Sequence, residues 1–286
     1  MPGDRFTDLR RNFTWYKERL GAEWLVLRDR LRRKRCTGDC PVVVSLTTHG
    51  FRLDMVHMAI RSIVAGSVRP LRLILWLDAP GVPLPRELEE LKRRGLEILY
   101  CDNFGPHTKY YPYVQRYVGD GLPLVTADDD VIYARDWLRT LWRAHVRQPQ
   151  IIHCHLARRI ALQEGALGPY LNWGYTRSPA ASPLNFALGL AGVIYPPAFV
   201  QALHDAGEGF RACCPKADDV WLHHMALRHG YPVQQTCEQP EYPHPIPGSQ
   251  VEALWMQNLH GGGNDQQIRA TYEGDEVQAL QAAGSG

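Results

Sequence analysis

Three adjacent carboxylates, Asp128, Asp129 and Asp130, are the residues of this chain whose spacing most clearly suggests chemistry. The apolar run 124–126 precedes them and the β-prone residues 131–133 follow, which predicts an acidic turn at the end of a buried strand. Open α/β sheets bind ligands outside the carboxyl ends of their strands. Carboxylate oxygens suit a hard cation such as Mg²⁺ or Mn²⁺, which can bridge the oxygens of a diphosphate. The alternative is a solvated Asp-rich turn.

A second acidic pair, Asp218 and Asp219, opens a helical pattern over 220–229. Neighbours at a helix start lie about 100° apart around the axis, so one carboxylate can cap the helix while the other points elsewhere. A carboxylate placed near a reacting hydroxyl group can act as its general base. Capping alone is the alternative interpretation.

Basic residues occur in the block 105–111, upstream of the first acidic turn. Lys109 stands at a predicted helix start, where it can meet a phosphate. The alternative for both His107 and Lys109 is a solvated loop, because single basic residues near turns are common.

The elements that must position these residues alternate along the chain. Apolar runs over 41–47, 71–77 and 96–99 are typical of strands, and the stretches 56–66 and 85–94 are typical of helices. This alternation predicts parallel strands with helices on both faces, the doubly wound α/β arrangement. Open sheets of this kind bind ligands beyond their strand ends. Thr47, Thr48 and Arg52 close or follow the first strand, and Asp78 follows the second.

The pattern continues less regularly in the second half. A helix over 135–146 and a strand over 151–154 precede an irregular excursion, 155–184, whose segment 170–175 is aromatic. Long loops in compact domains are usually functional. A last short strand is expected over 231–235, and the chain beyond it is rich in proline, glycine and polar residues.

Composition excludes several classes of protein. The chain has 286 residues, 45% of them hydrophobic, and a net charge of +2, which indicates no general affinity for nucleic acid. No apolar run approaches the ~20 residues that span a bilayer, so the expected location is cytoplasmic. Seven irregularly spaced cysteines favour reduced thiols. Neither a dinucleotide-binding glycine fingerprint nor a phosphate-binding P-loop is present.

An amphipathic helix is predicted over residues 6–35. Its apolar residues recur at steps of three and four: Leu9, Phe13, Tyr16, Leu20, Trp24, Leu27 and Leu31. Arginines and a lysine crowd its end, so the helix could rest on an acidic membrane surface. The alternative is that the stripe packs on the domain or on a second subunit. We expect the helix to be dispensable for chemistry, so that a chain starting near Pro41 still binds its ligand.

Taken in order, the motifs between Val42 and Gly230 resemble the GT-A glycosyltransferases, and among them the family 2-like bacterial enzymes of surface polysaccharide, capsule and lipopolysaccharide assembly. The strand ending in Asp128, Asp129 and Asp130 resembles their acidic metal and nucleotide motif. The pair Asp218 and Asp219, followed by Val220 and Trp221, resembles their paired-acid motif. Supporting pieces are Thr47, Thr48 and Arg52, the block 106–111, and Gly189, Gly192 and Tyr195 before Pro196.

The resemblance implies a GT-A-like, Rossmann-like fold and a role for each motif. Asp130 would lie nearest a Mn²⁺ or Mg²⁺ ion, with Asp128 toward the metal or the ribose, and His260 would be a further metal ligand with His244 as its competitor. Asp219 would be the base of an inverting transfer, while Asp218 caps the helix or holds the acceptor. The donor-binding residues would be Thr47, Thr48, Arg52, Asp78, His107, Lys109, Asp128 and Asp129.

The function expected from this resemblance is metal-dependent transfer of a hexose or pentose from a nucleotide-sugar donor to a growing glycan acceptor. We expect a lipid-linked acceptor, because a cytoplasmic chain with a basic amphipathic helix could work at the membrane face. The catalytic domain would span 41–240, preceded by the helical extension 1–40 and followed by a partly flexible segment, 241–286, that closes the site. Two alternatives are a sugar nucleotidyltransferase and a non-catalytic module whose aromatic segment 170–175 binds a glycan or a partner. The first usually has a glycine-rich basic loop after its first strand, whereas residues 45–52 contain one glycine.

Overall fold

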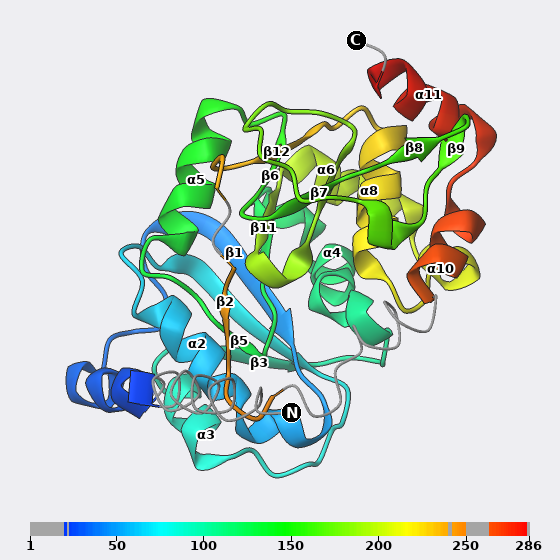
Figure 1. The fold of residues 1–286 in the computed structure, drawn as a ribbon. Coiled ribbons are helices and arrows are strands. Elements are labelled where there is room, and N and C mark those ends of the chain that lie inside the picture. Colours follow the sequence, from blue (N-terminus) through cyan, green and yellow to red (C-terminus); the bar gives the residue numbers. More distant parts are fainter. Residues whose placement is uncertain (1–19, 22, 240–241, 250–262, 285–286) are drawn as a thin grey trace, which may run out of the picture.

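The protein folds around one seven-stranded sheet with helices on both faces (Figure 1). The computed structural model describes residues 20–21, 23–239, 242–249 and 263–284. In spatial order the strands are β12 (Val233–Gln235), β6 (Ile152–Cys154), β11 (Val193–Tyr195), β4 (Leu124–Thr126), β1 (Cys40–Thr47), β2 (Pro70–Leu77) and β3 (Glu97–Tyr100).

Pairing within this sheet is parallel except at β11. Strand β1 pairs in parallel with β2 and β4, β2 with β3, and β6 with β12, whereas β11 runs antiparallel to β4 and β6. The predicted α/β class, a mixed and mostly parallel sheet flanked by helices, is therefore confirmed. Parallel pairing places the carboxyl ends of β1, β2 and β4 along one edge of the sheet.

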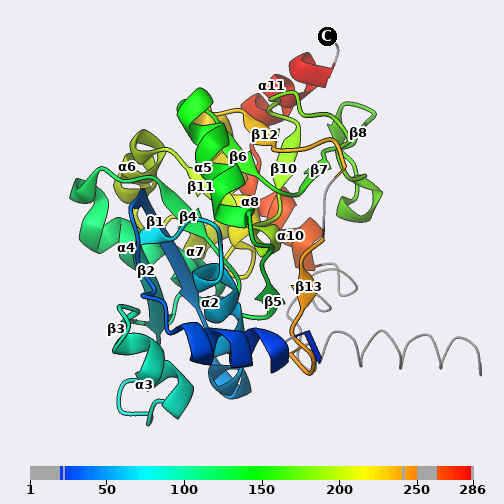
Figure 2. The same ribbon diagram turned by 90° about the vertical axis from the view of Figure 1, so that its left-hand side faces the viewer.

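Alternate residues of β1 enter two separate hydrophobic cores. Val42, Val44 and Leu46 pack with the helices of one face, and Val43 packs with those of the other. The first face carries α2 (Val56–Val64), α3 (Arg86–Lys92) and α5 (Trp137–Arg147); the second carries α4 (Tyr111–Tyr117), α6 (Pro197–Ala206) and α8 (Asp218–Arg228). The two layers of helices are separated by the sheet in Figures 1 and 2. A strand buried on both faces needs the near-continuous apolar run seen over 42–46.

The amino-terminal helix, over 20–21 and 23–32, is tied to the domain through Asp29. Asp29 is 5% exposed and pairs with Arg61 of α2 and with Arg94, which follows α3. The apolar stripe points away from the domain, since Leu20, Trp24, Leu27 and Leu31 are all more than half exposed. The interpretation that this stripe packs on the domain is therefore wrong for the described part of the helix, and residues 6–19 lie outside the described residues.

The irregular excursion and the carboxyl-terminal region contain more structure than the sequence pattern indicated. Within 155–184 lie β7 (Ala157–Arg159), which pairs with β10 (Asn185–Ala187), and the hairpin of β8 (Leu162–Gln163) and β9 (Ala166–Leu167). Beyond 240, β13 (His244–Pro245) pairs with β5 (Val131–Ile132), and helices α10 (Gly263–Thr271) and α11 (Gly274–Gly284) follow. Ile268, Tyr272 and Leu280 of this region are buried in the main core.

Two expectations from composition can be compared with the structure. No disulfide joins any of the seven cysteines, all of which lie in the described residues, and this agrees with the reduced thiols that their spacing predicted. Within the described ranges, no helix has both the length and the apolar character needed to cross a membrane.

Candidate active site

The carboxyl ends of β1 and β4 bring the first strand's polar residues onto the acidic turn. The Thr48 hydroxyl donates a hydrogen bond to Oδ2 of Asp129 at 2.6 Å, and Nη1 of Arg52 donates to Oδ1 of Asp129 at 3.0 Å. The same Arg52 nitrogen lies 3.2 Å from Oδ2 of Asp130. Burial raises the pKa of Asp129, and Arg52 and Thr48 oppose that shift. Asp129 is thus an internal anchor that orders the turn, held by two residues predicted to bind a donor.

Lys109 connects the two acidic motifs. Its ammonium group donates a hydrogen bond to Oδ1 of Asp128 at 2.7 Å and lies 3.0 Å from Oδ2 of Asp218. Lys109 ends a 3₁₀ turn, η2 (Gly105–Lys109), whose backbone is fixed by a buried serine of β1: Ser45 Oγ donates to the Lys109 carbonyl at 2.6 Å. Segments far apart in sequence therefore meet at one cation.

The charge of Lys109 is stabilised by its neighbours. Burial by itself would lower the pKa of this ammonium group, but the carboxylates of Asp128, Asp218 and Asp219 outweigh burial and raise the pKa well above its ordinary value. A buried lysine that keeps its charge can interact strongly with an anionic ligand, because few solvent molecules screen it. The burial of Lys109 contradicts the solvated-loop alternative, and its phosphate-facing role stays a prediction.

Asp219 occupies the inner side of the cluster. Its Oδ1 accepts a hydrogen bond from the backbone N–H of Gly189 at 3.1 Å, and its side chain is partly exposed. Burial, the nearby Asp218 and, more weakly, Asp128 raise its pKa well above 3.8, while Lys109 opposes them. No side-chain hydrogen bond caps the start of α8, where Ala217 is the N-cap residue. The capping interpretation of this acidic pair, including the cap role suggested for Asp218, is therefore wrong.

Two glycines allow close approaches of the chain, Gly189 to this cluster and Gly192 to Trp137. A Cβ atom at Gly189 would lie 2.9 Å from Oδ1 of Asp219 and 3.3 Å from Nζ of Lys109. Gly192 has φ +100°, and a Cβ there would lie 2.4 Å from the Trp137 indole nitrogen. Both positions need glycine, one for space and the other also for its backbone conformation.

Tyr133 supports the acidic turn, although the sequence gave no signal for this role. Its hydroxyl accepts a hydrogen bond from the Asp128 N–H at 2.7 Å and donates one to the Leu190 carbonyl at 3.3 Å. Burial, then the charges of Asp128 and Asp130, raise its pKa. The carboxylates of Asp128 and Asp130 are therefore both close enough to the Tyr133 hydroxyl to affect its ionisation. Ser45 and Tyr133 were missed because their sequence neighbours are ordinary strand residues.

Three residues predicted to bind the donor lie outside this cluster of contacts. The Thr47 hydroxyl donates to the Trp76 carbonyl at 3.1 Å, and Asp78 accepts a hydrogen bond from the Asn103 side chain. His107 is buried, with Nε2 2.8 Å from the Cys214 carbonyl and Nδ1 2.9 Å from the Tyr110 hydroxyl. Burial lowers the pKa of His107 to about 4, so it is a neutral core residue. As placed, its ring nitrogens are engaged by protein groups rather than available to a donor.

The acidic turn supplies two candidate metal ligands, Asp128 and Asp130. Both face cations of the chain, Lys109 and Arg52, and no group of three or more His, Cys, Asp or Glu side chains forms a metal site within the described residues. Mg²⁺ is commonly held by one or two carboxylates together with substrate phosphates and water, so two aspartates are chemically adequate. His260, the predicted third ligand, lies outside the described residues.

The competing ligand, His244, is exposed on β13 beside Ile132. This carboxyl-terminal strand is fixed directly on the acidic turn, because the backbone N–H of Ile246 donates to the Asp130 carbonyl at 2.7 Å. The hydroxyl of Ser249 lies 3.3 Å from the same carbonyl.

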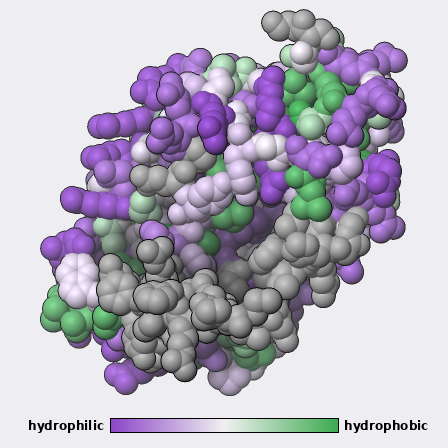
Figure 3. All heavy atoms as spheres, in the orientation of Figure 1, coloured by the Kyte–Doolittle hydropathy of each residue, from purple (hydrophilic) through white to green (hydrophobic). Residues whose placement is uncertain are grey.

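The surface of the molecule is hollowed near the candidate site. In the space-filling view, the face turned to the viewer is hollowed near its centre, around the carboxyl end of β1 (Figure 3).

The aromatic segment 170–175 does not form an exposed binding face. Tyr170 and Trp173 are buried in the main core, and Tyr175 alone of these three aromatics is substantially exposed. Arg158 lies between the rings of Tyr170 and Tyr175, at 4.8 and 4.9 Å from their centroids. The burial of Tyr170 and Trp173 therefore does not support the alternative of a non-catalytic module that binds a glycan or a partner through this segment.

Comparison with known proteins gives a distant structural likeness. No family model matches the chain, and no curated protein matches it. Its fold is similar to the crystal structure of S. aureus TarS, residues 1–349, with a TM-score of 0.48 and 11% sequence identity. The match covers 71% of this chain and 59% of that one, so the chain spans less than two thirds of that structure. A likeness at this level carries no functional argument, and the function is argued below from the site.

Proposed function

We propose that this protein is a metal-dependent glycosyltransferase that moves a sugar from a nucleotide-sugar donor to a glycan acceptor, with inversion at the anomeric carbon. The observation that carries the proposal is the position of Lys109, whose ammonium group lies between Asp128 of the first acidic motif and Asp218 of the second. Two motifs 90 residues apart thereby share one charged cluster, at the strand edge where open α/β sheets bind ligands.

The cluster contains the groups that such a transfer requires. The bond between the sugar and the diphosphate breaks, and its electron pair leaves with the diphosphate, whose growing negative charge Lys109 can neutralise. The acceptor hydroxyl forms the new bond to the sugar and passes its proton to a carboxylate, the role we assign to Asp219. A Mn²⁺ or Mg²⁺ ion held by Asp128 and Asp130 would add charge neutralisation at the phosphates.

The acidic residues thus have separate tasks. Asp129 is committed to Thr48 and Arg52 and orders the turn. We assign Asp128 and Asp130, which also contact Lys109 and Arg52, to the metal and the donor. Asp218 would position Lys109 between the two motifs. We assign the acceptor to the side of Asp219, and we take the acceptor to be a growing surface glycan, as the resemblance implies.

Nucleotide binding measured by calorimetry tests this proposal. A panel of nucleoside diphosphates and their sugars, each with and without Mn²⁺, should reveal binding that needs the metal. Asp130→Ala should abolish that binding and leave the fold intact, because Arg52 keeps its hydrogen bond to Asp129. Asp205→Ala removes an exposed acid on α6 and should bind like the parent.

The same measurements can contradict the proposal. Unchanged nucleotide affinity in Asp130→Ala would remove the metal role from the acidic turn. Glycan binding that needs neither nucleotide nor metal would indicate the non-catalytic module instead. Metal-dependent cleavage of a nucleoside triphosphate by a sugar phosphate would indicate the nucleotidyltransferase.

A further inference from the structure

The amino-terminal helix is apolar on two opposite faces, and one of them has no partner within the described residues. Leu25, Val26 and Asp29 face the domain and are partly or fully buried. Leu20, Trp24, Leu27 and Leu31, on the opposite side by helical spacing, are 62%, 59%, 56% and 78% exposed. Figure 3 shows the resulting hydrophobic patch at the lower left, over the position of this helix in Figure 1.

Cations flank this exposed face on both sides. Arg28 and Arg30 project about 80° to either side of the stripe by helical spacing, and the Arg28 guanidinium lies over the Trp24 ring at 5.2 Å from its centroid. The helix end continues with Arg32, Arg33, Lys34 and Arg35. The one aspartate in this stretch, Asp29, is used internally by Arg61 and Arg94. Arg30 also pairs with Glu87, and Glu23 is exposed on the same margin. The exposed face is therefore apolar at its centre, and its positive charge is concentrated at Arg28 and at the helix end.

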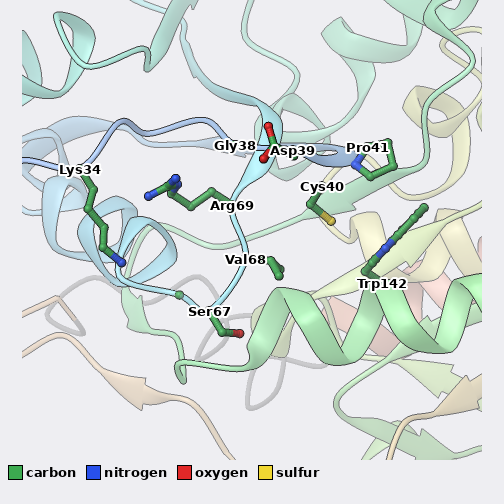
Figure 4. Close-up of a pocket in the computed structure, with 10 residues that line it drawn as sticks. Lys34, Gly38, Asp39, Cys40, Pro41, Ser67, Val68, Arg69 and Trp142 are labelled. Atoms are coloured by element: carbon green, nitrogen blue, oxygen red, sulfur yellow. The ribbon is translucent and has the colours of Figure 1, made fainter.

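A basic cavity of about 540 Å³ continues the charged margin beyond the helix. The cavity is lined by Lys34, Ser67, Arg69 and Trp142, and Asp39 is the acidic residue in its lining. Figure 4 shows the side chains of Lys34 and Arg69 on the same side of this cavity. Burial lowers the pKa of Lys34, and Arg69, Arg32, Arg28 and Arg135 lower it further, as expected where cations crowd. Within the described part of the chain, Lys34 and Arg69 form no ion pair.

This surface lies away from the candidate active site. The cavity is built at the amino-terminal ends of β1 and β2, whereas the acidic cluster lies at their carboxyl ends. The helix is at the front of the view in Figure 2, on the side of the molecule where α5 also faces the viewer. A ligand on this surface would leave the acidic cluster uncovered.

We propose that this face binds the surface of a bilayer containing anionic lipids, with the helix lying in the interface. Leucines and a tryptophan on one face, bordered by arginines, are the pattern by which interfacial helices bury apolar side chains while their cations meet lipid phosphates. Charge complementarity argues against a second copy of this chain, because a symmetric contact between two such stripes would bring their arginines together. Asp29 joins the helix to the domain through Arg61 and Arg94, so a bilayer that binds the helix would also orient the domain.

Co-sedimentation of the full chain with vesicles tests the proposal. Binding should be strong to an equal mixture of phosphatidylcholine and phosphatidylserine, weak to phosphatidylcholine alone, and should decrease as salt is added. The double variant Leu27→Glu, Leu31→Glu should lose binding at an unchanged melting temperature. Leu171→Glu is the matched control, because Leu171 is 57% exposed on a different surface, and it should bind like the parent. Arg28→Gln with Arg32→Gln should weaken binding about tenfold or more.

Three results would overturn this inference. One is equal binding to neutral and anionic vesicles. Another is a loss of binding in Leu171→Glu that matches the loss in the helix variant. The third is absence of vesicle binding together with a dimer, seen by light scattering, that Leu27→Glu dissociates, since the face would then be an oligomer interface. None of these measurements depends on glycosyl transfer.

Discussion

Asp219 combines partial exposure with a raised pKa, two properties that suit a general base near neutral pH. A base acts only when deprotonated, so activity should fall as pH decreases through the pKa of Asp219, and this acid limb should lie above the ordinary aspartate value of 3.8. Asp219→Asn can keep the hydrogen bond from Gly189 through its amide oxygen. We expect it to preserve donor affinity and melting temperature while turnover falls ~10²- to 10⁴-fold, measured by steady-state kinetics.

Asp218→Asn is the comparison for this variant, because it removes one of the two carboxylates in contact with Lys109 and leaves Asp219 in place. If Asp218→Asn is dead and Asp219→Asn remains active, the two roles are exchanged. The anomeric configuration of the product, read by NMR, tests the mechanism separately. A product that retains the donor configuration would contradict inversion.

Gly189 is a position where an added methyl group would meet two residues of the candidate site, Asp219 and Lys109. Gly189→Ala places Cβ against Asp219 and Lys109, so we expect turnover to fall by at least about tenfold with a loss of stability below about 2 kcal/mol. Gly119→Ala, where a Cβ meets no atom within 4 Å, is the control and should match the parent in both measurements. Equal activity in the two variants would show that the Gly189 contact is not part of the site.

At the level of single residues, the sequence indicated the acidic residues but not the contacts among them. Asp128 to Asp130 and the pair Asp218 and Asp219 stand out because adjacent carboxylates follow an apolar run in one case and open a helical pattern in the other. Their connection through Lys109 depends on a long-range approach that no local pattern encodes. His107 shows the opposite error, since its position near a turn suggested a ligand-binding residue, whereas packing against Phe210 makes it part of the core.

The amino-terminal helix is held by ion pairs that differ sharply in burial. Asp29 and Arg61 form a buried pair, whereas Arg30 and Glu87 form an exposed one. Asp29→Ala would leave Arg61 buried beside Glu90 alone, and removing one partner of a buried pair typically costs about 3–5 kcal/mol. Glu87→Gln should cost less than about 1 kcal/mol. Urea unfolding of the two variants checks this, and similar free energies of unfolding would contradict the anchoring role of Asp29.

This anchoring changes the expectation for a shortened chain. The sequence predicts that a chain starting near Pro41 still binds its ligand, but such a chain lacks Asp29 and leaves Arg61 without its main partner. The 3.6-residue period predicted helix over the described residues 20–21 and 23–32 correctly. It could not tell which face would pack, because the stripe with the more regular period faces outward and a buried aspartate holds the other face.

For the molecule as a whole, the strand and helix alternation was sufficient to predict the sheet. Strands with near-continuous apolar runs, such as 42–46, are buried on both faces, and that property is visible in sequence. The antiparallel pairing of β11 with β4 and the pairing of β13 with β5 were not predictable, because each pairing joins segments more than 60 residues apart in sequence. The helices beyond residue 263 were missed, since a region rich in glycine and polar residues gives little periodic signal.

The carboxyl-terminal helices belong to the folded core, and a hydrogen bond tests that assignment. The hydroxyl of Tyr272 lies 2.6 Å from Nδ1 of His223, whose Nε2 lies 2.8 Å from the Pro183 carbonyl. His223 is neutral, because burial lowers its pKa to about 4, so Nε2–H donates to the carbonyl and Nδ1 accepts from Tyr272. Tyr272→Phe would leave a buried acceptor unsatisfied, which costs about 1–3 kcal/mol.

Tyr242→Phe is the control for this last variant, because Tyr242 is 52% exposed and its loss should change stability by less than about 0.5 kcal/mol. Chemical denaturation followed by fluorescence should give a single transition for both variants, with a lower midpoint for Tyr272→Phe. A segment that only closes over the site would behave differently, since its detachment would leave the main transition unchanged. An unshifted midpoint in Tyr272→Phe would therefore place the carboxyl-terminal helices outside the cooperative fold and restore the original view of a flexible closing segment.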